Sequence, residues 1–324
     1  IQPHSRFLLT LLTPLPMEPP IRSSLESLLQ RLEGAYAKAT LRAYRADFLT
    51  FAQFCEGKGW SSLPGSPSAV AEFVEWLSAT GLCSSSIRRA VAGIATLHNL
   101  SRLPDPTKDP EVKLAMRRMH RMLGRASRQA QAVHSEELER LLEATDDSLR
   151  GLRNRALLLV GYDTLCRRSE LVSLETGDLK PGKVLLRRSK TDPHGLGRWL
   201  QLSPRTDSAL KAWLSASGIS SGVIFRGISP SGTLTSGLCT SQVNRILKRL
   251  ARMAQIDPAA ISGHSLRVGA AQDLLKKGAS LPAIMHRGRW SKTDTVMRYL
   301  ENAPVAFEEE GFSEKSALTL PHKD

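Results

Sequence analysis

Apolar residues recur at helical spacing through the first part of the chain. After Lys38 they occupy every third or fourth position and so lie on one face of a helix: Leu41, Tyr44, Phe48, Phe51 and Cys55. Serine or aspartate precedes several such segments and glycine follows them, as at helix caps. The pattern predicts helices that begin near Ser23 and cover residues 38–56, 66–79, 84–100 and 109–123. This part is therefore predicted to be an all-helical unit of about five helices.

The rest of the chain is predicted to form a second unit. Residues 124–133 are small and polar without an apolar face, which is typical of an extended linker. An apolar helix is expected over 152–165. Between Lys183 and Leu202 β-type residues flank a Pro/Gly turn, which predicts a hairpin, and residues 223–225 are a candidate third strand. Further helices are predicted over 240–254, 265–277, 280–288 and 291–300.

Composition makes a polyanion the first partner to consider and an acidic protein surface the second. The 324 residues carry 45 Lys and Arg against 31 Asp and Glu, a formal net charge of +14. No run approaches the ~18 to 20 apolar residues of a membrane span. The cysteines at 55, 83, 166 and 239 match neither zinc-site nor disulfide-framework spacing. We expect a cytoplasmic protein with no metal, no cofactor and no membrane contact.

The cations of the first unit gather in a way that favours nucleic acid. Residues 113–128 contain six Lys or Arg and no acid, although such a run is usually only a solvated face. Two other predicted helices also carry cations, one of them directly after the serines at 84–86, and arginine forks and helix N-termini are groups that hold DNA phosphates. The candidate contacts are Lys38, Arg42, Arg45, Arg88, Arg89, Arg117, Arg118 and Arg121. No aromatic-rich sheet suggests single-strand or RNA binding, so duplex DNA is the expected ligand.

Five segments of the second unit carry a chemical set in a fixed order. They supply, in chain order, Arg167 with Glu170, Lys190, His264 with Arg267, Trp290, and Tyr299. This order, and the spacing from His264 onward, resembles the tyrosine site-specific recombinases of the phage integrase family, most closely the Cre-type branch. The likeness includes TLRAYRADFLTFAQFC, LHNLSRLPDP and AMRRMHRM and covers roughly residues 21–304. Taken singly, Trp290 and Tyr299 are more often core residues, but the joint set is specific.

The resemblance implies a mainly α fold with two domains. Residues 21–126 would form a helical, SAM-like core-binding domain, and residues 127–133 a linker. Residues 134–304 would form an α-rich catalytic domain with a small antiparallel hairpin or sheet. Residues 1–20 are interpreted as a leader or upstream extension. The tail, 305–324, departs from the family because Gly311 interrupts what would otherwise be a docking helix.

Each residue of the set has a chemical reason to be there. Attack on a phosphodiester builds negative charge, which Arg167 and Arg267 would clamp. His264 and the Trp290 indole would donate to the same phosphate, or His264 would take a proton. The resemblance implies that Tyr299 is the nucleophile and forms a 3′-phosphotyrosine without metal or ATP. Lys190 would protonate the leaving 5′ oxygen, and Glu170 would orient a cation.

The resemblance also implies the partners. These are double-stranded DNA with inverted-repeat half-sites and a homo-tetramer acting on two such sites; accessory proteins are not indicated. The helix near Thr240 would read bases and presents Ser241, Gln242, Asn244 and Arg245. Two alternatives stay open: a type IB topoisomerase that relaxes DNA as a monomer, and a sequence-specific DNA-binding protein without activity.

Overall fold

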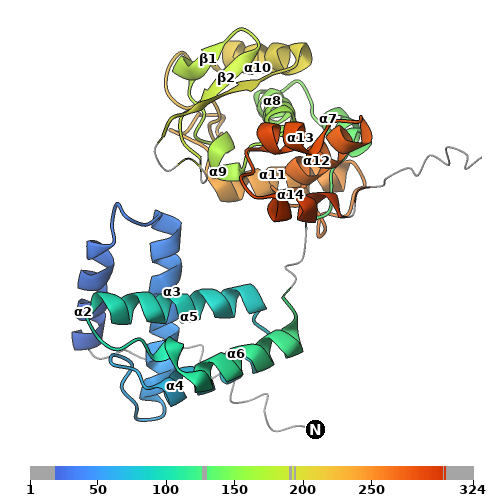
Figure 1. Cartoon of the computed structure of the whole chain (residues 1–324). Coiled ribbons are helices and arrows are strands. Elements are labelled where there is room, and N and C mark those ends of the chain that lie inside the picture. Colours follow the sequence, from blue (N-terminus) through green and yellow to red (C-terminus); the bar gives the residue numbers. More distant parts are fainter. Residues whose placement is uncertain (1–18, 126–129, 190–191, 193–194, 302, 304–324) are drawn as a thin grey trace, which may run out of the picture. The chain divides into compact units, whose positions relative to one another are not determined.

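The computed structural model describes residues 19–125, 130–189, 192, 195–301 and 303 (Figure 1). The backbone divides into two compact units, residues 1–128 and 129–324. Each unit has its own hydrophobic core. The predicted fold class is confirmed, because the chain is mainly helical and its one small sheet is antiparallel. Within the described residues, no helix combines the length and the apolar character that a membrane span needs.

The first unit is a bundle of helices built around aromatic rings. Two of its helices begin at side-chain caps: Ser66 Oγ accepts from Ala69 N at 3.1 Å, and Asp109 Oδ1 accepts from Glu111 N at 2.8 Å. The rings of Phe51 and Phe73 lie 5.1 Å apart in the core. The elements are α2 (Pro19–Arg31), α3 (Lys38–Glu56), α4 (Pro67–Ala79), α5 (Ser84–Leu100), a 3₁₀ turn (Pro106–Lys108) and α6 (Pro110–Leu123), so the predicted helices are confirmed.

The second unit is a set of helices with a small sheet. Its helices are α7 (Ser135–Glu143), α8 (Leu149–Thr164), α9 (Arg168–Leu171), α10 (Pro204–Ser217), α11 (Thr240–Met253), α12 (Ser265–Lys276), α13 (Leu281–Gly288) and α14 (Thr293–Leu300). A 3₁₀ turn (Thr176–Asp178) leads into the strands β1 (Leu179–Lys180), β2 (Lys183–Leu186) and β3 (Arg198–Gln201). All neighbouring strands are antiparallel, with Val184 paired to Leu200. The predicted hairpin is confirmed as β2 and β3.

Two predictions for this unit are corrected. The third strand is β1, not residues 223–225, where Val223 forms only an isolated bridge to Glu175. Two separate hydrogen bonds hold this segment instead of a strand ladder: Ile224 N donates to the Leu174 carbonyl, and the Trp213 indole donates to the Ile224 carbonyl. The second correction adds helix α10, which the sequence pattern does not predict although Ser203 is its N-cap and proline is its first residue. Its Trp213 is fully buried and anchors the helix.

The start of the second unit packs directly on helix α12. Val133 N donates to the Ser265 carbonyl at 3.1 Å, and a Cβ at Gly269 would lie only 1.7 Å from the Val133 carbonyl oxygen. Asp273, one turn further along α12, accepts from His134 Nδ1 and from Ser135 N, both at 2.7 Å. The chain is therefore tied to α12 along two of its turns.

We predict that Gly269→Ala destabilises the protein because its methyl group would overlap the Val133 backbone. Overpacking of this kind costs about 1–3 kcal/mol, so the thermal midpoint should fall by several degrees. The matched control is Gly177→Ala, whose Cβ would meet nothing within 4 Å. Equal midpoints for the two variants would show that residues 133 and 269 are not in close contact in solution.

Candidate active site

The loop after helix α8 positions the first arginine. Helix α8 ends at Thr164, its C-cap Leu165 has a left-handed backbone (φ 50, ψ 32), and Arg167 is the N-cap of α9. Glu170 Oε2 accepts from Arg167 N at 2.9 Å, while Glu170 Oε1 accepts from Arg167 Nη1 at 2.7 Å. Glu170 thus fixes both the backbone and the guanidinium of Arg167. The neighbouring Arg168 packs against Gly263 instead, so the two arginines have different surroundings.

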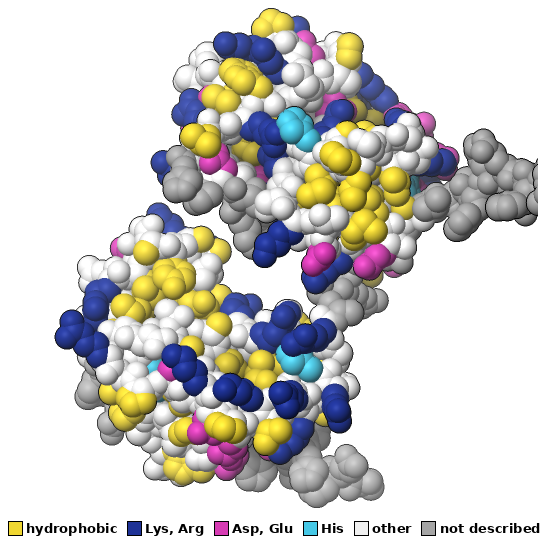
Figure 2. Space-filling view, in the orientation of Figure 1, with side chains coloured by type: hydrophobic (Ala, Val, Ile, Leu, Met, Phe, Trp, Pro, Cys, Tyr) yellow, Lys and Arg dark blue, Asp and Glu magenta, His cyan; other side chains and the backbone are white. Residues whose placement is uncertain are grey.

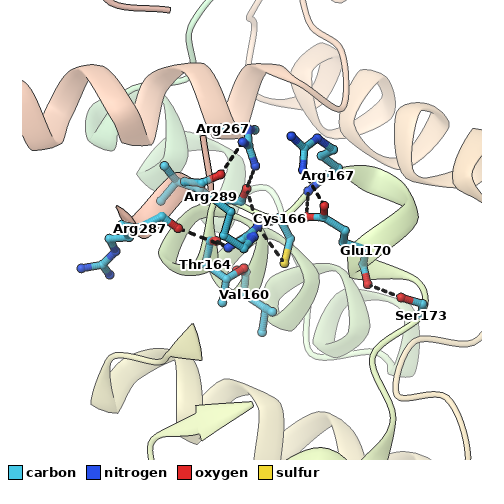
Figure 3. A network of polar contacts seen from close by, with 11 residues as sticks. Val160, Thr164, Cys166, Arg167, Glu170, Ser173, Arg267, Arg287 and Arg289 are labelled. Atoms are coloured by element: carbon cyan, nitrogen blue, oxygen red, sulfur yellow. Dashed lines mark hydrogen bonds and ion pairs between the residues drawn. The ribbon is translucent and has the colours of Figure 1, made fainter. Parts of the chain in front are cut away.

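A further arginine, Arg289, holds the same carboxylate from the opposite side. Its Nη2 lies 2.9 Å from Glu170 Oε2. Its Nη1 and Nη2 also donate to the carbonyls of Thr164 at 2.8 Å and Leu165 at 3.1 Å, as Figure 3 shows. Sequence reasoning missed this residue, since an arginine between glycine and tryptophan is typical of a surface turn. No local signal distinguishes it.

Charge keeps Glu170 ionised in spite of its burial. Burial raises the pKa of the carboxyl, but the charge of Arg289 and the hydrogen bonds and charge of Arg167 outweigh it, so the pKa lies below its ordinary value. Glu170 is therefore a carboxylate at neutral pH and accepts from both arginines in their charged forms.

The second arginine of the set is enclosed. Arg267 is fully buried, and its Nη atoms donate to the carbonyls of Leu165 and Gly288. Its guanidinium lies 4.3 Å from the centroid of the Trp290 ring. Burial and the charges of Arg167 and Arg289 lower the pKa of Arg267 to about 10, so it stays protonated at neutral pH. Among the atoms described, its Nε is a buried donor with no hydrogen-bond partner.

Trp290 lies between this arginine and the candidate nucleophile. The rings of Trp290 and Tyr299 are 5.0 Å apart and tilted by 53°. Trp290 is buried above Gly288, where a Cβ would overlap the indole, whereas Tyr299 is only half-buried. Gln272 Nε2 donates to the Tyr299 carbonyl at 2.7 Å and ties α14 to α12. The structure therefore brings Arg167, Arg267, Trp290 and Tyr299 together.

His264 joins this group from the N-cap of α12. Its backbone N donates to Ser262 Oγ at 3.2 Å, and its side chain reaches the solvent. Partial burial of the ring lowers the pKa of His264, and the charges of Arg267, Arg168 and Arg167 lower it further. At neutral pH the ring is therefore uncharged, with one nitrogen that donates and one that accepts.

An open cleft of about 490 Å³ lies beside these residues. Its walls come from the β2–β3 hairpin on one side, including Gly197 and Arg198, and from His286, Arg289 and Trp290 on the other. Lys190 belongs to the turn of this hairpin but lies outside the described residues. In the described part of the chain, no three His, Cys, Asp or Glu residues come together in a way that could hold a metal ion.

The Lys and Arg side chains of the first unit that are predicted to contact DNA are all exposed, but some of them are engaged in ion pairs. Figure 2 shows Lys and Arg side chains gathered over α5 and α6. Arg45, Arg89 and Arg118 form ion pairs with Glu26, Asp47 and Glu75 respectively. Among described side chains, five of the predicted contacts form no ion pair: Lys38, Arg42, Arg88, Arg117 and Arg121. Their charges face the solvent uncompensated.

Helix α11 uses two of its predicted DNA-reading residues internally. Gln242 Oε1 accepts from Cys239 N at 2.9 Å and caps the helix, and Asn244 Oδ1 accepts from Gly263 N at 2.7 Å. Ser241 and Arg245 remain exposed. Lys248 and Arg252 continue their face at helical spacing and were missed by sequence reasoning.

Comparison with known proteins decides the family. The model of the phage integrase family matches residues 131–305, more than half of the chain. The chain belongs to the phage integrase family. The N-terminal SAM-like domain of phage integrases also matches residues 25–101 of this integrase-family chain.

Curated relatives agree with this assignment, and solved structures share the fold. The chain is 31% identical over 291 residues to an integrase/recombinase XerD homologue of Selenomonas ruminantium, with 85% of each chain covered. It is 29% identical to the recombinase Cre of Escherichia phage P1, covering 83% of this chain and 85% of Cre. The fold resembles a XerH site-specific recombinase bound to palindromic difH substrate (TM-score 0.65, 19% identity), covering 87% of this chain and 81% of that one. A lambda integrase tetramer on a Holliday junction has a TM-score of 0.63 at 14% identity, covering 89% and 79%.

We predict that His264 titrates below the ordinary histidine pKa of about 6.5. The unfolded chain protonates His264 at a higher pH than the folded chain does. Protonation therefore favours the unfolded state, and the free energy of unfolding should fall as the pH drops below about 6.5. An NMR titration measures the pKa, and His264→Gln identifies the resonance and should remove that part of the pH dependence. A pKa above 6.5 would contradict the arginine surroundings described.

Proposed function

We propose that this integrase-family protein is a site-specific recombinase that cuts and rejoins duplex DNA through a 3′-phosphotyrosine at Tyr299. The observation that carries the proposal is the stack of Arg267, Trp290 and Tyr299 beside the Arg167–Glu170 pair. It combines a half-buried phenol with two guanidiniums, which are groups that stabilise the charge that develops in phosphoryl transfer.

The proposed step exchanges one phosphodiester for another. The Tyr299 oxygen attacks the phosphorus, its phenolic proton leaves to a base, and the bond to the 5′ oxygen breaks as that oxygen takes up a proton. Religation reverses the step on another strand. Because the bond energy is kept in the phosphotyrosyl link, no ATP is consumed. Arginine charges, rather than a metal ion, stabilise the extra negative charge.

Arg167 and Arg267 form the proposed phosphate clamp. Arg167 is already partly exposed and oriented by Glu170. Arg267 has an unsatisfied buried Nε donor, a group that a phosphate oxygen would complete. The Trp290 ring lies over the Arg267 guanidinium, and its indole N–H would be a further donor to the phosphate.

The two remaining members handle protons. His264 is uncharged at neutral pH, so it is able either to accept the Tyr299 proton or to donate to a phosphate oxygen. We assign protonation of the 5′ oxygen to Lys190, because the hairpin that carries it borders the cleft beside Trp290.

Both units are proposed to bind the DNA, and four protomers to join two sites. The exposed cations on α3, α5 and α6 would bind phosphates, while Ser241, Arg245, Lys248 and Arg252 on α11 would face a groove of the DNA. Inverted-repeat half-sites are suggested by the palindromic substrate of XerH, and a tetramer by the lambda integrase assembly. The protein would act in the cytoplasm, where such DNA is accessible. A type IB topoisomerase would relax DNA of any sequence as a monomer, and an inactive DNA-binding protein would form no adduct.

We predict that Tyr299→Phe binds target DNA but forms no covalent adduct, because only the nucleophilic oxygen is removed. Denaturing gels with a labelled suicide substrate, carrying a site selected from random DNA, measure the adduct. Tyr36→Phe is the matched control, since Tyr36 is an exposed tyrosine of the first unit, and it should react as the wild type does. An adduct in the Tyr299 variant would show that another residue is the nucleophile.

We predict that Lys190→Ala is severely slowed on normal DNA but cleaves almost as well as wild type when sulfur replaces the leaving 5′ oxygen. A thiolate, from a thiol of pKa about 8–9, leaves without a proton, whereas an alkoxide does not. Arg167→Ala provides the contrast, because its guanidinium acts on non-bridging oxygens and sulfur should not rescue it. If the sulfur substrate rescues a His264 variant and not Lys190→Ala, His264 is the general acid that protonates the leaving oxygen.

A further inference from the structure

Two features of the position of Arg289 are energetically unfavourable for an arginine. It has a left-handed backbone (φ 58, ψ 44), which residues with a Cβ rarely adopt and which suits glycine. Its side chain is only 4% exposed, so a charged group has also been taken out of water. A glycine would meet the backbone requirement with neither cost. The guanidinium therefore needs a reason that lies in its contacts.

Those contacts join both arginines of the proposed clamp. Through Glu170 Oε2, Arg289 reaches the carboxylate whose other oxygen holds Arg167. Through the Leu165 carbonyl, it shares an acceptor with Arg267. Figure 3 shows this arrangement, with Arg289 beneath the two other guanidiniums. One buried side chain thus contacts the support of each arginine.

We propose that Arg289 is a positioning residue for DNA cleavage, holding Glu170 and the Leu165 carbonyl in place so that Arg167 and Arg267 face one phosphate. The inference rests on the proposed recombinase function. A positioning residue does not itself bind the phosphate, so we expect its effect in the covalent step and not in DNA affinity.

The role has a specific pH signature. The charged and titratable groups around Glu170 are Arg167, Arg289, Arg267, His264 and Cys166. Of these, Arg289 makes the largest contribution that lowers the pKa of Glu170, while burial raises it. Without Arg289 the carboxyl takes up a proton at higher pH and then releases Arg167. The cleavage defect should therefore grow as pH falls.

The test measures single-turnover adduct formation at saturating full-length protein between pH 6 and 9, on a suicide duplex carrying the site that wild type selects from random DNA. Arg289→Gly should cleave roughly 10- to 100-fold more slowly at pH 7, the range typical of lost supporting contacts. The loss should be larger at pH 6 than at pH 9, and DNA affinity should stay within about twofold of wild type. Arg289→Lys, which keeps the charge, should recover part of the rate and the wild-type pH profile.

Two comparisons separate this role from a general loss of charge or stability. Arg287→Ala removes an exposed arginine two residues away, whose Nε donates to the Asp163 carbonyl, and should leave the rate and its pH profile unchanged. In a Glu170→Gln background, Arg289→Gly should cause a smaller loss than in the wild type, because the Arg289–Glu170 contact is already altered and mainly the contact with the Leu165 carbonyl remains to be lost.

Each outcome decides the matter. A wild type that forms no adduct on any selected site removes the proposed function itself. A wild type that reacts, with Arg289→Gly matching it across the pH range, removes only the positioning role. Full, multiplicative loss in the Glu170→Gln background also contradicts it. If Arg289→Gly does not fold, a wild-type rate for Arg289→Lys overturns the proposal.

Discussion

The Glu170 carboxylate lies buried between the guanidiniums of Arg167 and Arg289, and the candidate active site depends on this arrangement. A buried ion pair contributes little to stability over an apolar pair, but removal of one partner typically costs about 3–5 kcal/mol. The carboxylate is therefore a constraint on geometry. It fixes the turn after α8 and orients Arg167, and through Arg289 it is linked to the loop that carries Trp290.

The same constraint explains why the site is built from distant segments. The Leu165 carbonyl accepts from Arg267 on α12 and from Arg289 after α13, so the end of one helix joins two others. Helix α12 is in turn held to the start of the unit through Gly269 and Asp273. The candidate nucleophile on α14 is tied to α12 by Gln272. The site thus rests on packed helices, which keeps its groups at fixed distances.

Helical periodicity predicted most of this fold, because amphipathic helices with polar caps carry their signal locally. The helix over 38–56 is an example. Strand β1 has only two residues, too few to show an alternating pattern. The 223–225 segment has the apolar composition of a strand because Ile224 and Phe225 are buried in the core. Among the site residues, family spacing selected Arg167, whose contact with Glu170 is local. The role of Arg289 depends on a contact 119 residues away, and the internal use of Asn244 depends on Gly263, so neither is visible from the chain.

Chemical identification of the covalent intermediate tests the central claim most directly. The wild type would be reacted with a suicide duplex in excess EDTA, digested with nuclease and protease, and analysed by mass spectrometry. The account predicts a nucleotide joined through its 3′-phosphate to the oxygen of Tyr299. A 5′-phosphate linkage, a nucleotide on any other residue, or an adduct that forms only when Mg²⁺ is restored would contradict it.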